Sequence, residues 1–369
     1  MPDGLRRERT AARRARSPRD RSQAPVVAVT GAGGPVGGAV LRHLAASPRI
    51  GAVLGLDTTV AAPSAGDVAW HGLDPADPRI AQALAGVHAV VHCAVDLRPD
   101  SDRTAQRRRN LQRARTVLTA AFAAGVRQVV VVSSAMVYGA LADNPVPLPD
   151  GAPLRAVPEA SVLGDLLEIE RTAAEFAAAH PALTVTVLRP AIVLGAGPGS
   201  ALAALFEAPR LLRLRGTRPR WQFCHVDDLA AAAEAVLLAG LAGPVNVGCE
   251  GFCEHEEVER ATGRRSLELP ERVAVATAER LHRLGITPAP PSELDYLAHP
   301  WVVDCAALRA AGWLPTYAND QALRAHLSAL PARGETAVLG ATAAAGATVA
   351  LVGTAALVRR ARRRRRAGQ

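Results

Sequence analysis

The residues best suited to chemistry in this chain form a glycine-rich loop. Gly31, Gly34 and Gly37 recur at three-residue intervals, directly after the apolar run 26–30 and at the start of a helical pattern over 37–46. The first glycine permits a tight turn, the second lets the backbone approach a pyrophosphate, and the third lets helix and strand pack closely. The helix N-terminus then presents free N–H groups to the phosphates. This loop predicts a dinucleotide-binding site, the alternative being a turn that only caps a core strand.

An acidic residue lies where the second strand of such a unit ends. Asp57 follows the apolar run 52–56 and comes twenty residues after Gly37. A carboxylate in this position accepts hydrogen bonds from the adenosine ribose hydroxyls. The residues just after it, 58–60, include no arginine that could hold a 2′-phosphate. The sequence therefore predicts NAD as the cofactor and disfavours NADP.

The basic residues of the chain are all arginines, 43 in number, and there is no lysine. Enzymes built on a loop of this kind very often move a proton with a Tyr-x-x-x-Lys pair, in which the lysine lowers the tyrosine pKa. That pair cannot exist here. The sequence thus predicts cofactor binding and calls the usual proton chemistry into question.

Strand-like and helix-like segments alternate from residue 25 to about residue 328. This order is typical of an α/β fold with a Rossmann-type doubly wound parallel sheet, and near-continuous apolar strands such as 129–132 suit a sheet covered on both faces. We expect a basic disordered arm over 1–24, an NAD-binding domain over 25–190 and mainly a smaller substrate lobe over 191–330. Strands are predicted over 26–30, 52–57, 88–93, 128–133 and 184–189, and helices over 37–46, 80–85, 103–124 and 163–179.

The net charge of +9 comes from the two ends of the chain. Residues 1–24 contain eight arginines and 359–369 contain seven, whereas the body between them is mildly acidic. Neither arm contains an aromatic residue that could stack on bases, so no specific nucleic-acid binding is predicted. Five scattered cysteines without a signal peptide indicate free thiols in a reducing cytosol. Cys249, Cys253 and His255 match no zinc spacing, so no metal site is predicted.

The segment 337–358 is 22 residues long and uncharged, and the arginine tail follows it. As a helix it would be about 33 Å long, enough to cross a bilayer, although it is rich in alanine, glycine and threonine. We expect a cytoplasmic domain attached to a membrane surface or bilayer through 337–369. A span, a hairpin turning near residue 346 and an interfacial helix all remain open, because the positive-inside rule conflicts with a single span. The alternative is a helix that packs on the protein surface.

Several further motifs point to one family. They are Thr-Gly-x-x-Gly-x-x-Gly at 30–37, Leu-Asp at 73–74, Val-Val-His-Cys-Ala at 90–94, Val-Val-Ser-Ser-Ala-Met-Val-Tyr-Gly at 131–139, Leu-Arg-Pro at 188–190, Phe-Cys-His-Val-Asp-Asp at 223–228 and Gly-Pro-Val-Asn-Val-Gly at 243–248. Over residues 25–328 the chain resembles the extended short-chain dehydrogenase/reductases, specifically the NAD-dependent epimerase/dehydratase group. The resemblance implies a two-lobe fold, an NAD cofactor and a small-molecule substrate, commonly a nucleotide sugar.

The resemblance also assigns site residues. Ser134 is the catalytic serine that would hydrogen-bond the reacting hydroxyl or carbonyl group, and Asp74 is the adenine-contacting residue. The implied cofactor-binding residues are Thr30, Gly31, Gly34, Pro35, Val36, Gly37, Asp57, Asp74, Cys93, Ala94, Asn110, Ser133 and Pro190. The family often forms homodimers through two helices, which here correspond to 103–124 and 163–179.

The chain departs from the family at the two residues that move the proton. Val162 aligns with the family's tyrosine and Leu166 with its lysine, and neither can carry a proton. Either the position has become packing or another group supplies the proton, with Asp165 the leading substitute. Other nearby candidates are Glu168, His92 and Tyr138. His225 with Asp227 and Asp228 resembles part of a triad, although a structural role for these three is expected.

Two functions therefore remain open. The chain is either an enzyme of the extended family with a substituted acid/base, or a non-catalytic NAD(H)-binding sensor or scaffold tethered to a membrane. The second lobe contains no motif that names a substrate.

Overall fold

The computed structural model describes residues 24–59, 68–96, 102–195, 202–284 and 290–330. Nearly all of the predicted basic arm over 1–24, and the whole of 337–369, lie outside these ranges. Among the described residues, none of the helices combines the length and apolar character that crossing a bilayer requires.

The core of the fold is a seven-stranded parallel sheet with the order β11-β6-β5-β4-β1-β2-β3. Its strands are β1 (Val26–Thr30), β2 (Ala52–Asp57), β3 (Val68–Gly72), β4 (Ala89–His92), β5 (Gln128–Val132), β6 (Thr184–Pro190) and β11 (Gly243–Val247). The central strands are mostly apolar and buried because both faces of the sheet are covered, as predicted. The Rossmann-type sheet expected from the sequence is thus confirmed.

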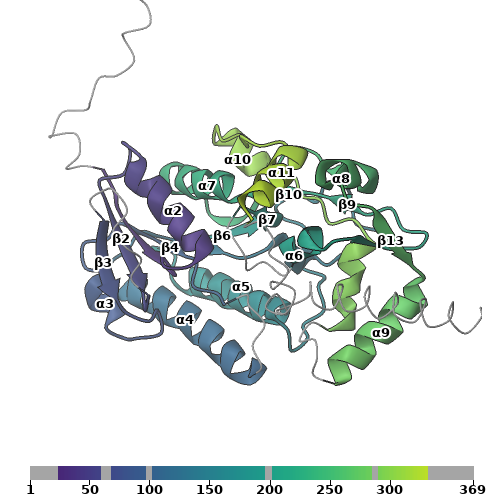
Figure 1. Ribbon diagram of the computed structural model, residues 1–369. Helices are drawn as coiled ribbons and strands as arrows, with labels where there is room; N and C mark the ends of the chain where they lie inside the picture. The colour runs from purple at the N-terminus through teal and green to yellow at the C-terminus, as the bar shows by residue number, and fades with distance from the viewer. Residues whose placement is uncertain (1–23, 60–67, 97–101, 196–201, 285–289, 331–369) are drawn as a thin grey trace, which may run out of the picture.

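Two layers of helices enclose this sheet (Figure 1). Helices α2 and α7 pack together over one face, and α4 and α5 pack together over the other, with α3 beside α4. Their bounds are α2 (Pro35–Ala46), α3 (Ile80–Ala83), α4 (Arg103–Ala123), α5 (Val162–Ala179) and α7 (Val226–Ala239). Helix α2 begins two residues earlier than predicted, because Pro35 is suited to the first helical position, where no backbone N–H is needed.

Three elements differ from the sequence-based expectation. Strand β3 at the sheet edge was not predicted, because its side chains are mostly exposed and form no apolar run. Helix α7 and strand β11 come after residue 190 in the chain, yet they complete the Rossmann layers. The second lobe therefore consists of elements that come before α7 and after β11 in the chain.

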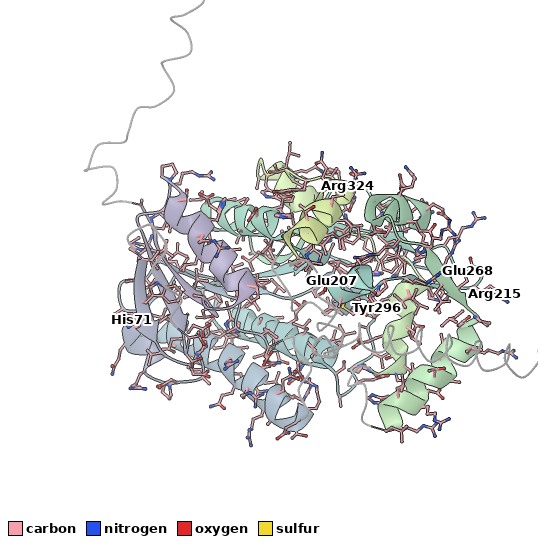
Figure 2. All side chains as sticks on the ribbon, in the orientation of Figure 1. His71, Glu207, Arg215, Glu268, Tyr296 and Arg324 are labelled. Carbon is pink, nitrogen blue, oxygen red and sulfur yellow. The ribbon has the colours of Figure 1, made fainter. Side chains whose placement is uncertain are left out.

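The second lobe contains three two-stranded sheets and several short helices. The strands pair as β7 (Ile192–Leu194) with β10 (Phe223–His225), β9 (Arg220–Trp221) with β12 (Cys253–Glu254), and β8 (Leu211–Leu214) with β13 (Ser266–Leu269). The helices are α6 (Ala203–Glu207), α8 (His255–Thr262), α9 (Glu271–Arg283), η2 (Pro291–Leu297), α10 (Ala306–Ala310) and α11 (Asn319–Ala329). Figure 2 shows Tyr296 of η2 on the inner side of this lobe, whereas Arg215 and Glu268 lie at its outer edge.

Candidate cofactor and active site

The carboxyl ends of the central strands meet at one edge of the sheet. Thr30, the last residue of β1, pairs with Leu56 of β2 and with His92 of β4. His92 in turn pairs with Val131 of β5. The residues that follow these strands therefore lie side by side, and this edge is where parallel α/β sheets bind ligands.

The glycine-rich loop after β1 is packed too tightly for side chains. Gly31 has φ +72°, and a Cβ atom on it would lie 2.8 Å from the backbone of Ala94. A Cβ atom on Gly37 would lie 2.1 Å from the carbonyl oxygen of Gly31. The first and third glycines are thus required for the turn and for the contact of helix with loop, as the sequence predicted.

The start of helix α2 is open to an anion. Gly34 is the N-cap residue and offers no side chain to cap the helix, and Pro35 occupies the first position. The N–H groups of the first turn have no partners within the helix, and they carry the positive end of the helix dipole. The close-packed glycine-rich loop leads into the free N–H groups at the start of α2. This arrangement fits the pyrophosphate of a dinucleotide.

Asp57 lies beside this loop at the end of β2. Its Oδ2 accepts from the Gly33 N–H over 3.1 Å, and its Oδ1 accepts from the Thr59 N–H over 2.9 Å and from the Thr58 hydroxyl over 3.3 Å. The carboxylate therefore braces the glycine-rich loop, and its binding of an adenosine ribose stays a prediction.

Asp74, the predicted adenine contact, is engaged by a neighbour that the sequence did not reveal. Arg113 of α4 donates from Nε to Oδ1 over 2.9 Å and from Nη2 to Oδ2 over 2.7 Å. These bonds lower the pKa of Asp74, against the effect of its burial. Arg113 also feels the charges of Asp57 and Asp96, so a guanidinium lies among the carboxylates at this end of the sheet.

His92 lies beneath the loop as a buried neutral imidazole. Its Nδ1 is 2.7 Å from the Thr30 hydroxyl, whereas its buried Nε2 has no partner among the described residues. Burial, reinforced by the charge of Arg113, lowers the pKa of His92 to about 4. Burial likewise raises the pKa of the adjacent Cys93 thiol to about 12. Neither residue is therefore charged at neutral pH, and neither is suited to exchange protons there.

The two serines that follow β5 have different environments. Ser133 is buried, and its hydroxyl donates to Glu170 Oε1 over 2.5 Å. Ser134 is partly exposed and caps η1 (Ala135–Tyr138) by accepting from the Met136 N–H over 3.2 Å. The Ser134 hydroxyl proton thus remains available to an oxygen of a bound ligand, in keeping with its predicted role.

A buried polar network supports this edge from behind. Arg189 donates to Glu170 Oε2 from Nε over 3.0 Å and from Nη2 over 2.6 Å, and also donates to the Tyr138 hydroxyl over 2.9 Å. The Tyr138 hydroxyl lies 2.8 Å from Asn246 Oδ1, and burial raises the pKa of Tyr138. Tyr138 therefore has a structural role and is not the missing proton donor.

The two positions that align with the family's tyrosine and lysine are apolar in structure as well as in sequence. Val162 is the first residue of α5 and is partly buried, and Leu166 packs in the apolar core shared with the second lobe, with 4% of its surface exposed. Leu166 therefore contributes to packing.

Asp165, the leading substitute, is fully enclosed by basic and amide groups. Its carboxylate contacts the guanidinium of Arg103, that of Arg107 over 3.1 Å and the Asn110 Nδ2 over 2.9 Å. Asn110 also bonds both backbone groups of Asp96 and so anchors the loop after β4. Asp165 and Asn110 thus join α4, α5 and this loop, which leaves Asp165 poorly suited to exchange a proton with a substrate.

The segment that resembles a triad is structural. His225 caps α7 by accepting from the Asp227 N–H over 3.3 Å, and its ring stacks on Tyr317 with centroids 3.8 Å apart. Asp228 is buried and accepts from the backbone of Thr316 and Tyr317 over 2.9 and 3.1 Å.

The cysteines of the chain are free thiols, and Cys224, Cys249, Cys253 and Cys305 are buried. Burial raises the pKa of each of these four thiols. Within the part of the chain that the structure describes, no group of histidine, cysteine or carboxylate side chains is arranged to hold a metal ion.

One part of the site was missed by sequence reasoning. Helix η2 places Glu293 and Tyr296 against the Rossmann domain, next to Glu159 and Met136. No motif marks η2, and it lies far along the chain from the residues that it approaches, so its role could not be recognised without the fold.

Comparison with known proteins identifies the family of this chain. The model of the NAD dependent epimerase/dehydratase family matches residues 27–248, more than half of the chain, and the chain belongs to this family. Uncharacterised proteins of Mycobacterium tuberculosis and Mycobacterium bovis are each 28% identical to it over 310 residues, covering 80% of this chain and 82% of theirs. The NAD cofactor predicted from the sequence is confirmed at the level of the family.

Solved structures share the fold. The UDP-glucose 4-epimerase of Thermotoga maritima, solved with UDP-glucose, superimposes with a TM-score of 0.62 at 17% identity, covering 82% of this chain and 97% of that one. The UDP-glucose 4-epimerase of Thermus thermophilus, in complex with NAD, gives 0.61 at 20% identity, with 82% and 98% covered. The dTDP-glucose 4,6-dehydratase of Bacillus anthracis, also with NAD, gives 0.62 at 15% identity, with 83% and 96% covered.

Proposed function

We propose that this chain is an NAD-dependent oxidoreductase that acts on a hydroxyl group of a nucleotide-sugar-like substrate, with a proton-transferring group different from the family's tyrosine. The chain's own residues supply three functions. The glycine-rich loop and the start of α2 bind the pyrophosphate, and Asp57 binds the adenosine ribose. Ser134 orients the reacting oxygen of the substrate. NAD supplies the hydride acceptor.

One observation carries this proposal. The hydrogen bonds that hold the end of β5 beside Ser134 are present, although Val162 and Leu166 have replaced the tyrosine and lysine. The buried pair of Glu170 and Arg189 still fixes the end of β5 through Ser133. Ser134 beside it is partly exposed, so its hydroxyl proton is available to an oxygen atom of a substrate. Loss of a proton carrier removes only part of the rate, because positioned acid/base groups typically contribute about 10²–10⁴-fold.

The first experiment is calorimetric titration of the full chain with NAD⁺, NADH and NADPH. Micromolar binding of NADH, with NADPH weaker, is the expected result. UDP-glucose and dTDP-glucose are then mixed with the chain and NAD⁺, and NADH is followed by its absorbance. Formation of NADH that is lost in Ser134→Ala supports the proposal. Binding of NADH with no reduction of NAD⁺ by either sugar would contradict it.

The replaced tyrosine and lysine favour a second candidate function, which is NAD(H) binding without turnover in a sensor or scaffold. In that case Ser134→Ala leaves the function of the protein in the cell unchanged. A clear loss of that function in Ser134→Ala would count against the sensor.

Membrane attachment belongs to this second candidate, and it depends on residues 337–369, which lie outside the described ranges. Removal of residues 336–369 is the test. We expect the intact chain to sediment with membranes and the truncated chain to stay wholly in the supernatant. Intact chain found in the supernatant would refute the anchor.

Pairing of two copies through α4 and α5 likewise remains a proposal. The outward surfaces of these helices expose charged side chains, among them Arg108, Arg115, Arg171 and Glu175. Sedimentation of the full chain at two salt concentrations tests it, because an interface rich in charge weakens as salt screens it.

A further inference from the structure

Helix η2 is held against the short helix that Ser134 caps. Tyr296 on η2 is buried, and its hydroxyl donates to the carbonyl oxygen of Met136 over 2.5 Å. Met136 comes two residues after Ser134. The face of η2 that bears Tyr296, seen on the inner side of the lobe in Figure 2, therefore contacts the short helix that Ser134 caps.

A second contact ties η2 to the segment that leads into α5. The Ser292 hydroxyl donates to Glu159 Oε2 over 3.0 Å. Glu159 comes three residues before Val162, which occupies the position of the family's tyrosine. Both contacts of η2 thus reach segments that flank the incomplete catalytic site.

Glu293 lies between these two contacts. It directly follows Ser292 and precedes Tyr296 by three residues. Because η2 is a 3₁₀ helix, side chains three residues apart are aligned on one face. Glu293 therefore shares the inner face with Tyr296.

The surroundings of Glu293 favour proton exchange at neutral pH. Its partial burial, together with the charge of Glu159, raises the pKa of Glu293 to about 7, and the guanidinium of Arg103 opposes this rise. The other titratable groups around η2 are Asp295 on the same helix, Glu271 at the start of α9, and His299. A carboxyl group with a pKa near the working pH both accepts and returns a proton.

The guanidinium of Arg103 adds a hydrogen-bond donor near Glu293. Its Nη1 donates to Gln106 Oε1 and its Nη2 to the carbonyl oxygen of Ser161, each over 2.6 Å. Its Nε is buried and has no acceptor among the described residues. A buried N–H group without a partner is costly, and an oxygen atom of a bound substrate would satisfy it.

We propose that Glu293 is the proton-exchanging group of this site and replaces the missing tyrosine. This inference rests on the function proposed above. A secondary alcohol bound between Ser134 and η2 loses its C–H hydride to the nicotinamide ring of NAD⁺ and its O–H proton to the Glu293 carboxylate. The alcohol becomes a ketone, and the other products are NADH and neutral Glu293. The reverse step returns both the hydride and the proton.

The test uses the full chain with NAD⁺ and UDP-glucose or dTDP-glucose as probes, mixed rapidly over a range of pH. NADH formation should become faster as pH rises, with an apparent pKa of about 7. Glu293→Gln should slow this step by about 10²–10⁴-fold, and Glu293→Asp should restore part of the rate. The matched control is Asp295→Asn, which removes an exposed carboxylate from the same helix and should leave the rate and pH profile unchanged.

A second measurement requires no turnover. Infrared difference spectra of the cofactor-free chain should show a carboxylic acid that titrates near pH 7 and is absent from Glu293→Gln. In Glu159→Gln the titration should move to lower pH, because the neighbouring negative charge is gone.

The outcomes separate the two proposals. An unchanged rate and pH profile in Glu293→Gln overturns the role of Glu293 and leaves the proposed function in place. Absence of the titrating carboxyl band from the unaltered chain also overturns it. Failure of the unaltered chain to bind NADH, or to reduce NAD⁺ with either probe, overturns the proposed function itself.

Discussion

Arg113 and Asp74 form a two-point ion pair between α4 and the end of the β3 region, with donor–acceptor distances of 2.9 and 2.7 Å. The side chains keep 19% and 36% of their surface exposed, so solvent weakens the pair. Arg113→Gln and Asp74→Asn should each lower the free energy of unfolding by about 1 kcal/mol, and the double variant by less than their sum. Urea denaturation measures this coupling. Arg115→Gln, which breaks a more exposed pair on the same helix, should change stability by less than about 0.5 kcal/mol.

The same pair separates what the sequence could and could not reveal. Asp74 was identified through the family resemblance of the Leu-Asp motif at 73–74, whereas the strand ends and the glycine-rich loop follow from local patterns. Strands and helices show a local periodicity of two or 3.6 residues, and the loop shows glycines at fixed spacing, so both can be read from neighbouring residues. The partner of Asp74 lies 39 residues further along the chain, and no local pattern connects the two.

The surroundings of Asp165 and of Glu293 could not be predicted either, because no local sequence pattern connects these residues to their neighbours in the fold. Asp165 appeared to be a substitute acid because it is next to Leu166 in sequence, yet three groups from α4 surround its carboxylate. No pattern in the sequence marks Glu293, because its partial burial and its proximity to Glu159 exist only once the lobe has folded. Proton-transfer chemistry depends on such tertiary environments, which a single sequence does not display.

Gly37 should tolerate no side chain. A Cβ atom at this position would lie 2.1 Å from the carbonyl oxygen of Gly31, so Gly37→Ala must displace the loop from α2. We expect NADH affinity to fall at least about tenfold, with a loss of stability of about 1–3 kcal/mol. Gly38→Ala is the matched control, since its Cβ atom would meet its nearest neighbours at 3.3 and 3.4 Å. Gly38→Ala should keep NADH binding, and equal binding by both variants would contradict the role of the tight contact.

Asp57 should set the preference for NADH. Asp57→Asn keeps the size of the side chain but removes the charge that attracts ribose hydroxyls, and it weakens the bonds to Gly33 and Thr59. NADH binding should weaken by about 1–2 kcal/mol, or several-fold to about 30-fold. NADPH binding should change less, because its 2′-phosphate no longer meets a carboxylate. Tighter binding of NADPH than NADH by the unaltered chain would refute the predicted preference.

Arg189 and Glu170 form the buried ion pair on which the end of β5 rests. Their side chains are 8% and 3% exposed, and Ser133 and Tyr138 complete their hydrogen bonds. Arg189→Met leaves the Glu170 charge buried without its partner and should cost about 3–5 kcal/mol of unfolding free energy. The double variant Arg189→Met with Glu170→Leu should be more stable than Arg189→Met alone, because no unpaired charge remains. A double variant as unstable as the sum of the two single variants would show that the two residues act independently.

Glu234 should make the packing of α2 against α7 sensitive to acid. Its carboxylate on α7 accepts from the His43 Nε2 over 2.9 Å, the Ser47 hydroxyl over 2.5 Å and the Arg49 Nε over 3.1 Å. Burial opposes the charged form, yet these hydrogen bonds prevail and lower the pKa of Glu234 from 4.5 to about 2. A carboxyl group whose pKa is lower in the folded state stabilises the fold above the unfolded value and loses that stabilisation as the pH falls from 4.5 toward 2.

Glu234→Gln should therefore lower the free energy of unfolding at neutral pH by about 1–3 kcal/mol and should flatten its decline over this acid range. Urea unfolding at a series of pH values measures both effects. Glu175→Gln is a suitable control, because that carboxylate lies exposed on the opposite face of the sheet, on α5. If Glu234→Gln declined with acid as steeply as the unaltered chain, the acid sensitivity would arise elsewhere, and the contact between α2 and α7 would not depend on the charge of Glu234.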